Sequence, residues 1–463
     1  MSTDRRDALR AELLRRLGPE VVAADPADRR LASSDASRLY GDCLAVLRPR
    51  TEEETVAAVR AAVDLGVALT PRGAGTSPTG SAAATPEQAV LDFARMNRIV
   101  DVDARDLVAV VEPGVLCGDL QARCEALGLF YPPDPASSRT STLGGNVATC
   151  AGGLRAVKYG VTRDYVLGLR AVLGTGEVLE VGGRHLKSVV GYDLVRLFVG
   201  SEGTLGAFTR LTLKLLPKPE ACETVLASFA DEAGALAGAD AVLAAGVLPR
   251  ALEYLDRDVL EITAGFLGEA PPAGIGSRLL VEVDGDAASC GRAADRAVAA
   301  LSAAGAVESR RAADAVERDR LWRGRRAISP AVYRASPAKR SEDLGVPRSR
   351  LAAAIAEIKA VGRAEGLRVL AYGHAGDANL HVNFLYDPAR PGELERLRAA
   401  TSRAVDVALA HGGTVSGEHG VGLKKLDAAR RELSPRALAL MRGIKTLFDP
   451  RGVMNPGKAI PEE

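Results

Sequence analysis

The fold of this chain is decided by the stretch PPDPASSRTSTLGGNVATCAGG at residues 132–153. Its glycines allow the backbone to approach a flat ligand closely, and its Ser and Thr hydroxyl groups can hydrogen-bond such a ligand. Taken alone, the stretch also fits a pair of solvent-exposed loops. The choice between these interpretations depends on the sequence around it.

A second glycine-rich loop, PRGAGTSPTG at 71–80, lies upstream. We expect a helix over 51–66 and a short strand over 67–70 to lead into it. Pro78 and the glycine spacing exclude a G-x-G-x-x-G turn that opens a helix. Successive small residues can form an anion-binding nest of backbone N–H groups, although an ordinary tight turn is the alternative. Two such tracts in one domain favour a bound dinucleotide.

Composition and charge match an ordinary globular enzyme. The chain has 47% hydrophobic and 26% charged residues and a formal net charge of +1, so nothing indicates nucleic-acid binding. No apolar run approaches the roughly 20 residues that span a bilayer, and the N-terminus lacks an apolar signal core. We therefore expect a cytoplasmic protein without a transmembrane segment. The six cysteines form no C-x-x-C pair, which argues against an iron–sulfur cluster, a zinc ribbon or a disulfide framework.

The length of 463 residues predicts more than one domain, because single hydrophobic cores stop growing at roughly 250–300 residues. Up to residue 217, short β-rich runs alternate with Gly-containing turns, as in an α+β domain. Pro217 and Pro219 suit a domain junction. We predict an N-terminal helical segment at 1–37, a ligand-binding domain at 38–217 and a second domain at 218–463.

Four of the five histidines lie between 374 and 419. The segment RVLAYGHAGDANLHVNF at 368–384 has the pattern of strand, tight turn and strand, with the turn at 375–378. A hairpin of this kind brings His374 and His381 near one another. His411 has no motif partner, and we expect it to be structural.

A carboxylate accompanies these histidines in the segment GTVSGEHGVG at 413–422. Zinc and manganese are commonly held by two or more histidines and a carboxylate, with open positions left for substrate. Histidines that only satisfy structural hydrogen bonds are the alternative. Because Glu418 and His419 adjoin in a Gly-rich turn, the pattern favours a divalent metal site, zinc or manganese.

Several motifs together resemble a known family. They are PRGAGTSPTG, PPDP followed by STLGGNVATCAGG, KYGVTRDYVLGL at 158–169 and VGYDLVRLFVGSEGTLG at 190–206. This set is similar to the PCMH-type FAD-binding domain of the vanillyl-alcohol oxidase superfamily. The C-terminal half resembles the branch of glycolate oxidase catalytic subunits and of D-lactate and D-2-hydroxyglutarate dehydrogenases. The resemblance implies an α+β chain: an FAD-binding domain of two α/β subdomains, then an α+β substrate domain with an antiparallel sheet and a helical C-terminal segment.

The resemblance implies that FAD lies along these motifs, with residues 72–77 around its pyrophosphate. The implied cofactor-binding residues are Pro71, Arg72, Gly73, Ala74, Gly75, Thr76, Ser77, Gly80, Pro133, Asp134, Thr140, Ser141, Gly144, Gly145, Ala148, Ala151, Gly152, Glu202, Gly203, Gly206, Asn455 and Lys458. Many members attach FAD covalently through a His or Cys. The loop at 71–80 contains neither, so we expect non-covalent FAD.

The resemblance also implies roles in the C-terminal half. His374, His381 and Glu418 would bind the metal, Asn379 would lie close to the substrate, and His419 would take the hydroxyl proton.

A carboxylate substrate also needs a cation, preferably a guanidinium. The segment LWRGRRAIS at 321–329 resembles the one that carries such an arginine in the family. It implies Arg325, with Ser329 as a further substrate contact. Other basic residues that compete for this role or add a second positive group are Arg323, Arg326, Lys339 and Arg340.

The implied activity is FAD-dependent oxidation of a small D-2-hydroxy acid, such as glycolate, D-lactate or D-2-hydroxyglutarate, to the 2-keto acid. The metal lowers the hydroxyl pKa, the base removes the proton and hydride leaves Cα for the flavin. A non-redox flavin transferase of the alkyl-dihydroxyacetone-phosphate synthase type and a cofactor-binding subunit of a glycolate oxidase complex are the alternatives. The electron acceptor would be a quinone, an electron-transfer flavoprotein or a partner subunit. A homodimer or hetero-oligomer is compatible with the sequence, as is peripheral membrane association through a partner.

Overall fold

The computed structural model describes residues 1–39 and 41–462. The chain forms two compact units. Unit 1 comprises Met1–Gly152, Gly160–Lys218 and Glu418–Glu463, and unit 2 comprises Gly153–Tyr159 and Pro219–Gly417. The ranges 1–37, 38–217 and 218–463 stay predictions of domain boundaries, and residue 463 lies outside the described residues. Among the described residues, no helix is both long enough and apolar enough to cross a membrane.

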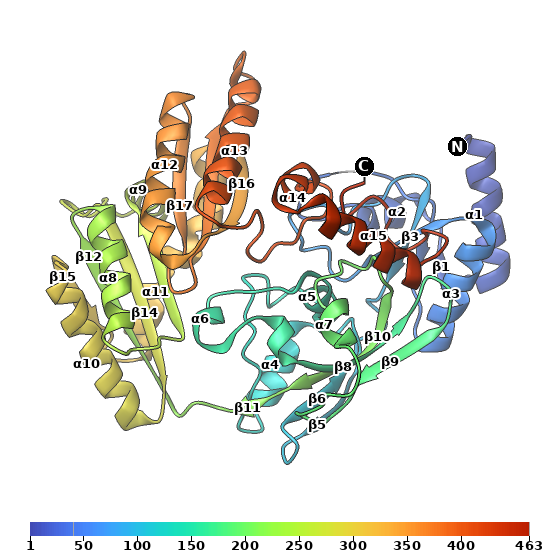
Figure 1. Ribbon diagram of the computed structural model, residues 1–463, viewed down its shortest axis with the longest axis horizontal. Coiled ribbons are helices and arrows are strands. Elements are labelled where there is room, and N and C mark those ends of the chain that lie inside the picture. Colours follow the sequence, from blue (N-terminus) through green and yellow to red (C-terminus); the bar gives the residue numbers. More distant parts are fainter. Residues whose placement is uncertain (40, 463) are drawn as a thin grey trace. The chain divides into compact units, whose positions relative to one another are not determined.

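Unit 1 contains a mixed sheet in the order β1-β2-β4-β3, an antiparallel sheet in the order β5-β6-β10-β8-β9 and the short pair β11-β7. In the first sheet β4 pairs in parallel with both β2 and β3. Figure 1 shows the strands β6, β8, β9 and β10 of the second sheet side by side. The elements of unit 1 are α1 (Thr3–Leu17), β1 (Val22–Ala23), α2 (Pro26–Ala32), β2 (Val46–Leu47), α3 (Glu52–Leu65), β3 (Ala68–Arg72), β4 (Gln88–Asp92), β5 (Ile99–Asp103), β6 (Val108–Val111), α4 (Cys117–Glu125), β7 (Leu129–Phe130), α5 (Leu143–Thr149), η1 (Thr162–Tyr165), β8 (Val166–Val172), β9 (Val178–Gly182), α7 (Leu194–Phe198), β10 (Ala207–Lys214), β11 (Leu216–Pro217), α14 (Leu426–Glu432) and α15 (Pro435–Phe448).

The helix and strand expected before the loop at 71–80 are present. Thr51 caps α3 by accepting a hydrogen bond from the Glu54 N–H at 3.2 Å, and Gly66 ends the helix in the left-handed conformation, as capping preferences predict. The apolar face of α3 packs on the first sheet in a core that includes Leu69 and Met454. This core holds β3 in place, so the loop that follows β3 starts from a rigid support.

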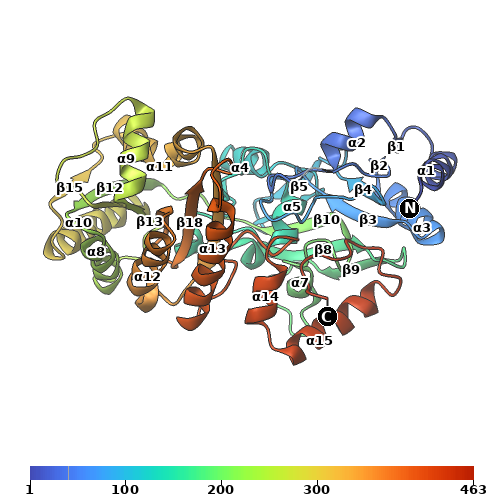
Figure 2. The same cartoon turned by 90° about the horizontal axis from the view of Figure 1, so that it is seen from above.

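Unit 2 is built on one antiparallel sheet in the order β15-β12-β14-β13-β17-β18-β16. Figure 2 shows α9 and α11 on one side of this sheet and α8, α12 and α13 on the other. The elements of unit 2 are α6 (Ala156–Tyr159), β12 (Ala221–Phe229), α8 (Glu232–Ala244), β13 (Ala251–Asp256), α9 (Arg257–Leu267), β14 (Ser277–Gly285), α10 (Ala287–Ala303), β15 (Glu308–Arg311), α11 (Ala315–Ala335), β16 (Ala338–Gly345), η2 (Arg348–Arg350), α12 (Leu351–Ala364), β17 (Arg368–His374), β18 (Asn379–Tyr386) and α13 (Glu393–Ala410).

The side of the sheet that carries α9 and α11 has an apolar part and a polar part. The apolar part includes Leu255, Trp322 and Leu370, which belong to one buried cluster. Because side chains alternate along a strand, Tyr372 and His374 follow Leu370 on the same face of β17. The core therefore fixes which strand positions face the polar part.

Strand pairing gathers polar side chains on this face. Tyr372 and Asp343 each lie opposite His381 on the two strands that flank β18. Glu253 on β13 lies opposite His374 on β17. The predicted hairpin with its turn at 375–378 is confirmed. We call Glu253, Asp343, Tyr372, His374 and His381 the histidine face.

Candidate active site

In unit 1, the two glycine-rich tracts recognised in the sequence lie against each other. A Cβ atom placed on Gly73 would be 2.1 Å from Thr142 Oγ1 and 3.5 Å from Gly145 Cα. Residues of the loop at 71–80 therefore pack on the start of α5, which is the centre of the tract at 132–153. Only glycine permits this approach at residue 73.

The start of α5 is closed from a second side. Thr142 caps the helix by accepting a hydrogen bond from the Gly145 N–H at 3.3 Å. The Gly144 N–H donates to the Pro113 carbonyl at 2.8 Å, and a Cβ atom on Gly144 would be 2.6 Å from Pro113 Cβ. The glycine pair is thus required by packing, and its backbone lies at the meeting point of three segments.

Residues 202–206 join the same region of unit 1. The Glu202 N–H donates to the Ala148 carbonyl at 2.7 Å, and a Cβ atom on Gly203 would be 3.0 Å from Pro71 Cγ. The Glu202 carboxylate accepts from the N–H groups of Val421 at 2.7 Å and Gly422 at 2.9 Å. Burial raises the pKa of Glu202 to about 7, although these two N–H groups oppose the shift.

The C-terminal motif closes this region. Asn455 has a left-handed φ of 46°, and its Nδ2 donates to the carbonyls of Ser81 at 3.0 Å and Glu202 at 2.7 Å. Lys458 Nζ donates to Asn455 Oδ1 at 2.7 Å and to Ala83 O at 2.5 Å. Burial lowers the pKa of Lys458 to about 7. The last residues of the chain therefore fasten the loops at 80–83 and 202–206.

Unpartnered buried polar atoms in the part of the chain that the structure describes give a second reason, besides the motifs, why unit 1 fits FAD. Buried polar atoms around α5 lack a hydrogen-bond partner among the described residues, and each such atom costs roughly 1–3 kcal/mol unless something satisfies it. These atoms are Tyr131 OH, Ser141 Oγ, Asn146 Nδ2 and Ser201 Oγ. A dinucleotide with many donors and acceptors is a ligand of the required kind.

Two further predicted FAD residues, Arg72 and Thr140, also have protein partners. The Arg72 guanidinium donates to the Ser34 carbonyl and, at 3.5 Å, to the Ala74 carbonyl. It lies under Gly75, where it supports the loop. Thr140 is exposed, and its hydroxyl donates to the Ser137 carbonyl at 3.1 Å. The hydrogen bonds of Arg72 thus stabilise the shape of the loop at 71–80.

In unit 2, the hairpin brings His374 and His381 together as expected. Their ring centroids are 5.2 Å apart and the ring planes are nearly perpendicular, at 85°. His374 is buried, and its Nδ1 lies 2.5 Å from Oε1 of the fully buried Glu253. His374 is therefore held in one orientation by a carboxylate from a distant part of the sequence.

Glu253 also holds Arg325. The Arg325 Nε donates to Glu253 Oε2 at 2.7 Å, and the guanidinium lies over the Tyr372 ring, 5.3 Å from its centroid. Burial raises the pKa of Glu253, but the neighbouring His374 and Arg325 outweigh burial and lower it to about 2. Glu253 is accordingly a carboxylate that joins a histidine to an arginine.

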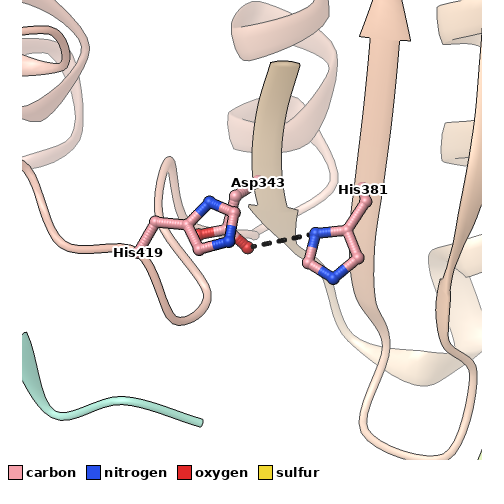
Figure 3. A group of neighbouring side chains, drawn as sticks. All are labelled: Asp343, His381 and His419. Atoms are coloured by element: carbon pink, nitrogen blue, oxygen red, sulfur yellow. Dashed lines mark ion pairs between the residues drawn. The ribbon is translucent and has the colours of Figure 1, made fainter. Parts of the chain in front are cut away.

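His381 has a carboxylate neighbour as well. Figure 3 shows the ion pair between His381 and Asp343, in which His381 Nδ1 lies 3.9 Å from Asp343 Oδ1. Asp343 is buried and accepts hydrogen bonds from Asn379 Nδ2 at 2.7 Å and Ser416 Oγ at 3.2 Å. Asn379 Oδ1 is buried and has no hydrogen-bond partner among the described residues.

The basic residues that compete with Arg325 differ in their surroundings. Arg323 pairs with Glu269 at 2.6 Å, Arg326 with Asp319 at 2.7 Å and Arg340 with Glu342 at 2.8 Å. Lys339 lies over the Tyr333 ring, 4.8 Å from its centroid. Ser329 is exposed, one turn after Arg325 on α11. Among the candidate arginines on α11, Arg325 contacts the histidine face, through Glu253 and Tyr372.

Glu418 and His419 belong to unit 1 and follow Gly417, the last residue of unit 2. Within unit 2, a Cβ atom on Gly417 would be 2.0 Å from Asn379 Nδ2. Within unit 1, the His419 carbonyl accepts a hydrogen bond from Thr79 Oγ1 at 3.4 Å. His411 Nε2 lies 3.0 Å from Glu357 Oε1, which agrees with a structural role.

The histidine face also fits a divalent cation. Two imidazoles and nearby carboxylates are the donors that zinc and manganese prefer. A ligating histidine usually gives its second ring N–H to a carboxylate, and His374 has Glu253 in that position. The unpartnered oxygen of Asn379 adds a further acceptor for a cation or a substrate hydroxyl.

Sequence reasoning missed several members of these regions. Glu253 and Asp343 lie in β13 and β16, whose pairing with the hairpin is not encoded in local sequence. The available signal for Glu253 was an acidic residue placed between Leu252 and Tyr254 in the segment ALEYLD. Tyr131 and Asn146 lie in or beside the recognised tract, but the tract alone does not show which of its polar groups are left without a partner.

The comparisons with known proteins agree with the fold. Residues 43–182 match the FAD binding domain family, and residues 218–459 match the family of FAD linked oxidases, C-terminal domain. The glycolate oxidase subunit GlcD of Bacillus subtilis (strain 168) is 38% identical over 451 residues, which cover 97% of this chain and 96% of that protein. The D-lactate dehydrogenase of Anaerostipes hadrus is 32% identical over 457 residues, which cover 96% of each chain.

Solved structures share the architecture. A crystal structure of p-cresol methylhydroxylase gives a TM-score of 0.79 at 16% identity and covers 100% of this chain and 98% of that one. Alkyldihydroxyacetonephosphate synthase gives 0.74 at 19% identity and covers 98% and 85%. At these identities the likeness shows the fold alone. The predicted PCMH-type FAD-binding domain and the second domain with an antiparallel sheet and a helical end are confirmed.

The two domain families and the full-length relatives identify the class of protein. This chain belongs to the FAD-linked oxidases and is a flavoprotein oxidoreductase.

Proposed function

We propose that this chain oxidises a small D-2-hydroxy acid to the corresponding 2-keto acid, with FAD in unit 1 and a divalent metal at the histidine face. The observation that carries the proposal is the pair of neighbouring imidazoles, His374 and His381. The Glu253 carboxylate contacts both His374 and Arg325, so the guanidinium lies close to this pair. Metal donors beside a guanidinium suit a substrate that carries both a hydroxyl and a carboxylate. The full-length relatives act on glycolate and D-lactate by name.

Each residue has a defined task in this proposal. His374 and His381 hold the metal, and Glu418 is proposed as the third ligand because its sequence motif supplies the carboxylate that commonly accompanies two histidines at a zinc or manganese site. Arg325 binds the substrate carboxylate, and Asn379 and Ser329 contact the substrate. His419 removes the hydroxyl proton at an imidazole nitrogen. When bound, FAD supplies the hydride acceptor, and a divalent cation supplies a Lewis acid for the hydroxyl oxygen.

The proposal also covers the cofactor, the metal, the electron acceptor and the location of the protein. FAD is held non-covalently by the residues of the loop at 71–80, the tract at 132–153, residues 202–206 and the C-terminal motif. Zinc or manganese is the metal. Electrons pass to a quinone, an electron-transfer flavoprotein or a partner subunit, and the word subunit in the name of the GlcD relative supports assembly with other chains. We place the protein in the cytoplasm.

Anaerobic reduction of the flavin tests this proposal. We expect the visible absorbance of bound oxidised FAD to bleach with at least one of glycolate, D-lactate and D-2-hydroxyglutarate. L-lactate is the control and should leave the spectrum unchanged. No bleaching with any hydroxy acid, together with ether-bond formation on an acyl dihydroxyacetone phosphate, would favour the transferase alternative.

A further inference from the structure

Each carboxylate oxygen of Glu253 contacts a different residue of the proposed site, and no sequence motif indicated either contact. Its Oε1 lies 2.5 Å from His374 Nδ1 and its Oε2 accepts from Arg325 Nε at 2.7 Å. Glu253 is fully buried, at 0% exposure, so neither contact is weakened by solvent. One carboxylate therefore links a proposed metal ligand on β17 with a proposed substrate-binding arginine on α11.

We propose that Glu253 is a positioning residue that orients His374 for metal binding and Arg325 for substrate binding at the same time. This inference rests on the proposed function, because it assigns Glu253 a task at the same site.

The hydrogen-bonding chemistry determines the His374 tautomer. An ionised carboxylate only accepts hydrogen bonds, so the Nδ1 atom of His374 must carry the proton when it faces Glu253. The Nε2 atom of a neutral imidazole then bears the lone pair, and a metal binds that nitrogen. Glu253 thus selects the ring nitrogen that is available as a ligand.

The second oxygen sets the direction of the guanidinium. Arg325 gives its Nε to Glu253 and stacks over the Tyr372 ring. Since both contacts fix the plane and one edge of the guanidinium, the terminal amino groups point in a defined direction. A planar fork held in this way is suited to a substrate carboxylate.

The isosteric change Glu253→Gln tests the tautomer. Arg325 can only donate, so the new amide oxygen must face it and the amide NH2 group must face His374. A donor at that place favours a lone pair on Nδ1 and a proton on Nε2, which removes the metal-binding lone pair. We expect zinc or manganese affinity to fall by about 10- to 100-fold, measured by chelator competition on the protein with FAD bound.

Glu282 offers a matched control on the same sheet. It is buried, its Oε2 accepts from Thr224 Oγ1 and Trp322 Nε1, both at 2.9 Å, and its Oε1 lies 3.1 Å from Arg250 Nε. Glu282→Gln also removes a buried charge that pairs with an arginine. We expect it to lower the unfolding temperature to a similar extent and to leave metal affinity unchanged.

Two further measurements separate positioning from stability. Nitrogen NMR of metal-free protein should report the Nδ1–H tautomer of His374 in the native chain and the Nε2–H tautomer in Glu253→Gln. In kinetics, Glu253→Gln keeps an acceptor for Arg325, so KM should change less than metal affinity, whereas Glu253→Ala should raise both KM and the metal dissociation constant.

The outcomes distinguish this inference from the proposed function. If His374→Ala and His381→Ala lose the metal while Glu253→Gln binds it as tightly as the native chain, the positioning role is wrong and the metal site stands. If none of the three variants changes zinc or manganese affinity, the metal site itself is wrong.

Discussion

The predicted flavin region of unit 1 and the histidine face of unit 2 are built in different ways. The predicted flavin region comprises the loop at 71–80, the tract at 132–153, residues 202–206 and the C-terminal motif. It is made of loops and the start of α5, where Gly73 and Gly144 allow segments to meet at backbone distance. The histidine face is made of side chains on paired strands, where register places His374 and His381. One site is shaped by backbone, the other by side chains.

This difference predicts how each region responds to substitution. A side chain added at Gly73 or Gly144 would overlap the neighbouring segment, so that segment would have to shift. A side chain exchanged on a strand changes the chemistry and leaves the hydrogen-bonded ladder in place. We expect FAD affinity to depend on the first kind of change and turnover on the second.

The largest effect is expected from His419→Ala. His419 lies in unit 1, where its backbone carbonyl accepts from Thr79 Oγ1, a contact that alanine retains, and its Nε2 lies 3.7 Å from Glu418 Oε1, a contact that alanine removes. Turnover should fall by about 10²- to 10⁴-fold, the usual contribution of a general base, while FAD stays bound. His411→Ala, which removes a pair with Glu357, is the control and should be fully active. Unchanged turnover in His419→Ala would remove it from the mechanism.

A smaller effect, on FAD affinity, is expected from Gly144→Ala. The new Cβ would lie 2.6 Å from Pro113 Cβ, and overpacking of this kind costs roughly 1–3 kcal/mol. FAD affinity, measured by fluorescence titration of apoprotein, should fall by about 10- to 100-fold. Gly443→Ala is the control, because no atom lies within 4 Å of its added Cβ in α15. Equal FAD affinity in both variants would contradict the packing argument.

Arg325→Lys should change substrate binding by a smaller factor. Lysine keeps the charge but loses the planar fork and the Nε contact with Glu253, so KM should rise by about 10-fold with a smaller change in kcat. Arg323→Lys exchanges the same residue type at the exposed pair with Glu269, and its KM should be native. An equal effect of both variants would exclude Arg325 as the specific carboxylate ligand.

The last effect concerns stability and leaves the assignment of the reaction untouched: it is a pH dependence of the free energy of unfolding. Burial lowers the pKa of Lys458 from 10.5 to about 7, so between these pH values the unfolded chain binds more protons than the folded chain. The free energy of unfolding contributed by Lys458 should therefore rise from pH 7 towards pH 10. Denaturant unfolding of native protein and Lys458→Met should show a difference that moves in favour of the native chain as pH increases. A difference that is constant with pH would contradict this assignment.

Local patterns predicted the parts of the fold in which neighbours in sequence are neighbours in space. The hairpin at 368–386 and the helix after Thr51 follow from period, turn and cap residues. The FAD-binding domain was predicted from long ordered motifs. Both kinds of signal lie within a few consecutive residues.

The contacts that the sequence did not predict join residues on strands that are far apart in the chain. Glu253 reaches His374 across 121 positions, and Asp343 reaches His381 through the register of β16 with β18. These contacts depend on the order of strands in the sheet, which no local pattern specifies. The sequence did favour Arg325 over its neighbours, but its link to His374 became visible only with Glu253 in place.

Chelation of the metal tests the central claim most directly. Protein with FAD bound is treated with a chelator, and flavin reduction by its hydroxy acid is followed anaerobically by stopped flow before and after zinc or manganese is restored. We predict that chelation slows reduction by about 10²-fold or more without release of FAD, and that added metal restores the rate. Equal rates in the chelated and the restored protein would contradict metal-assisted oxidation of a hydroxy acid.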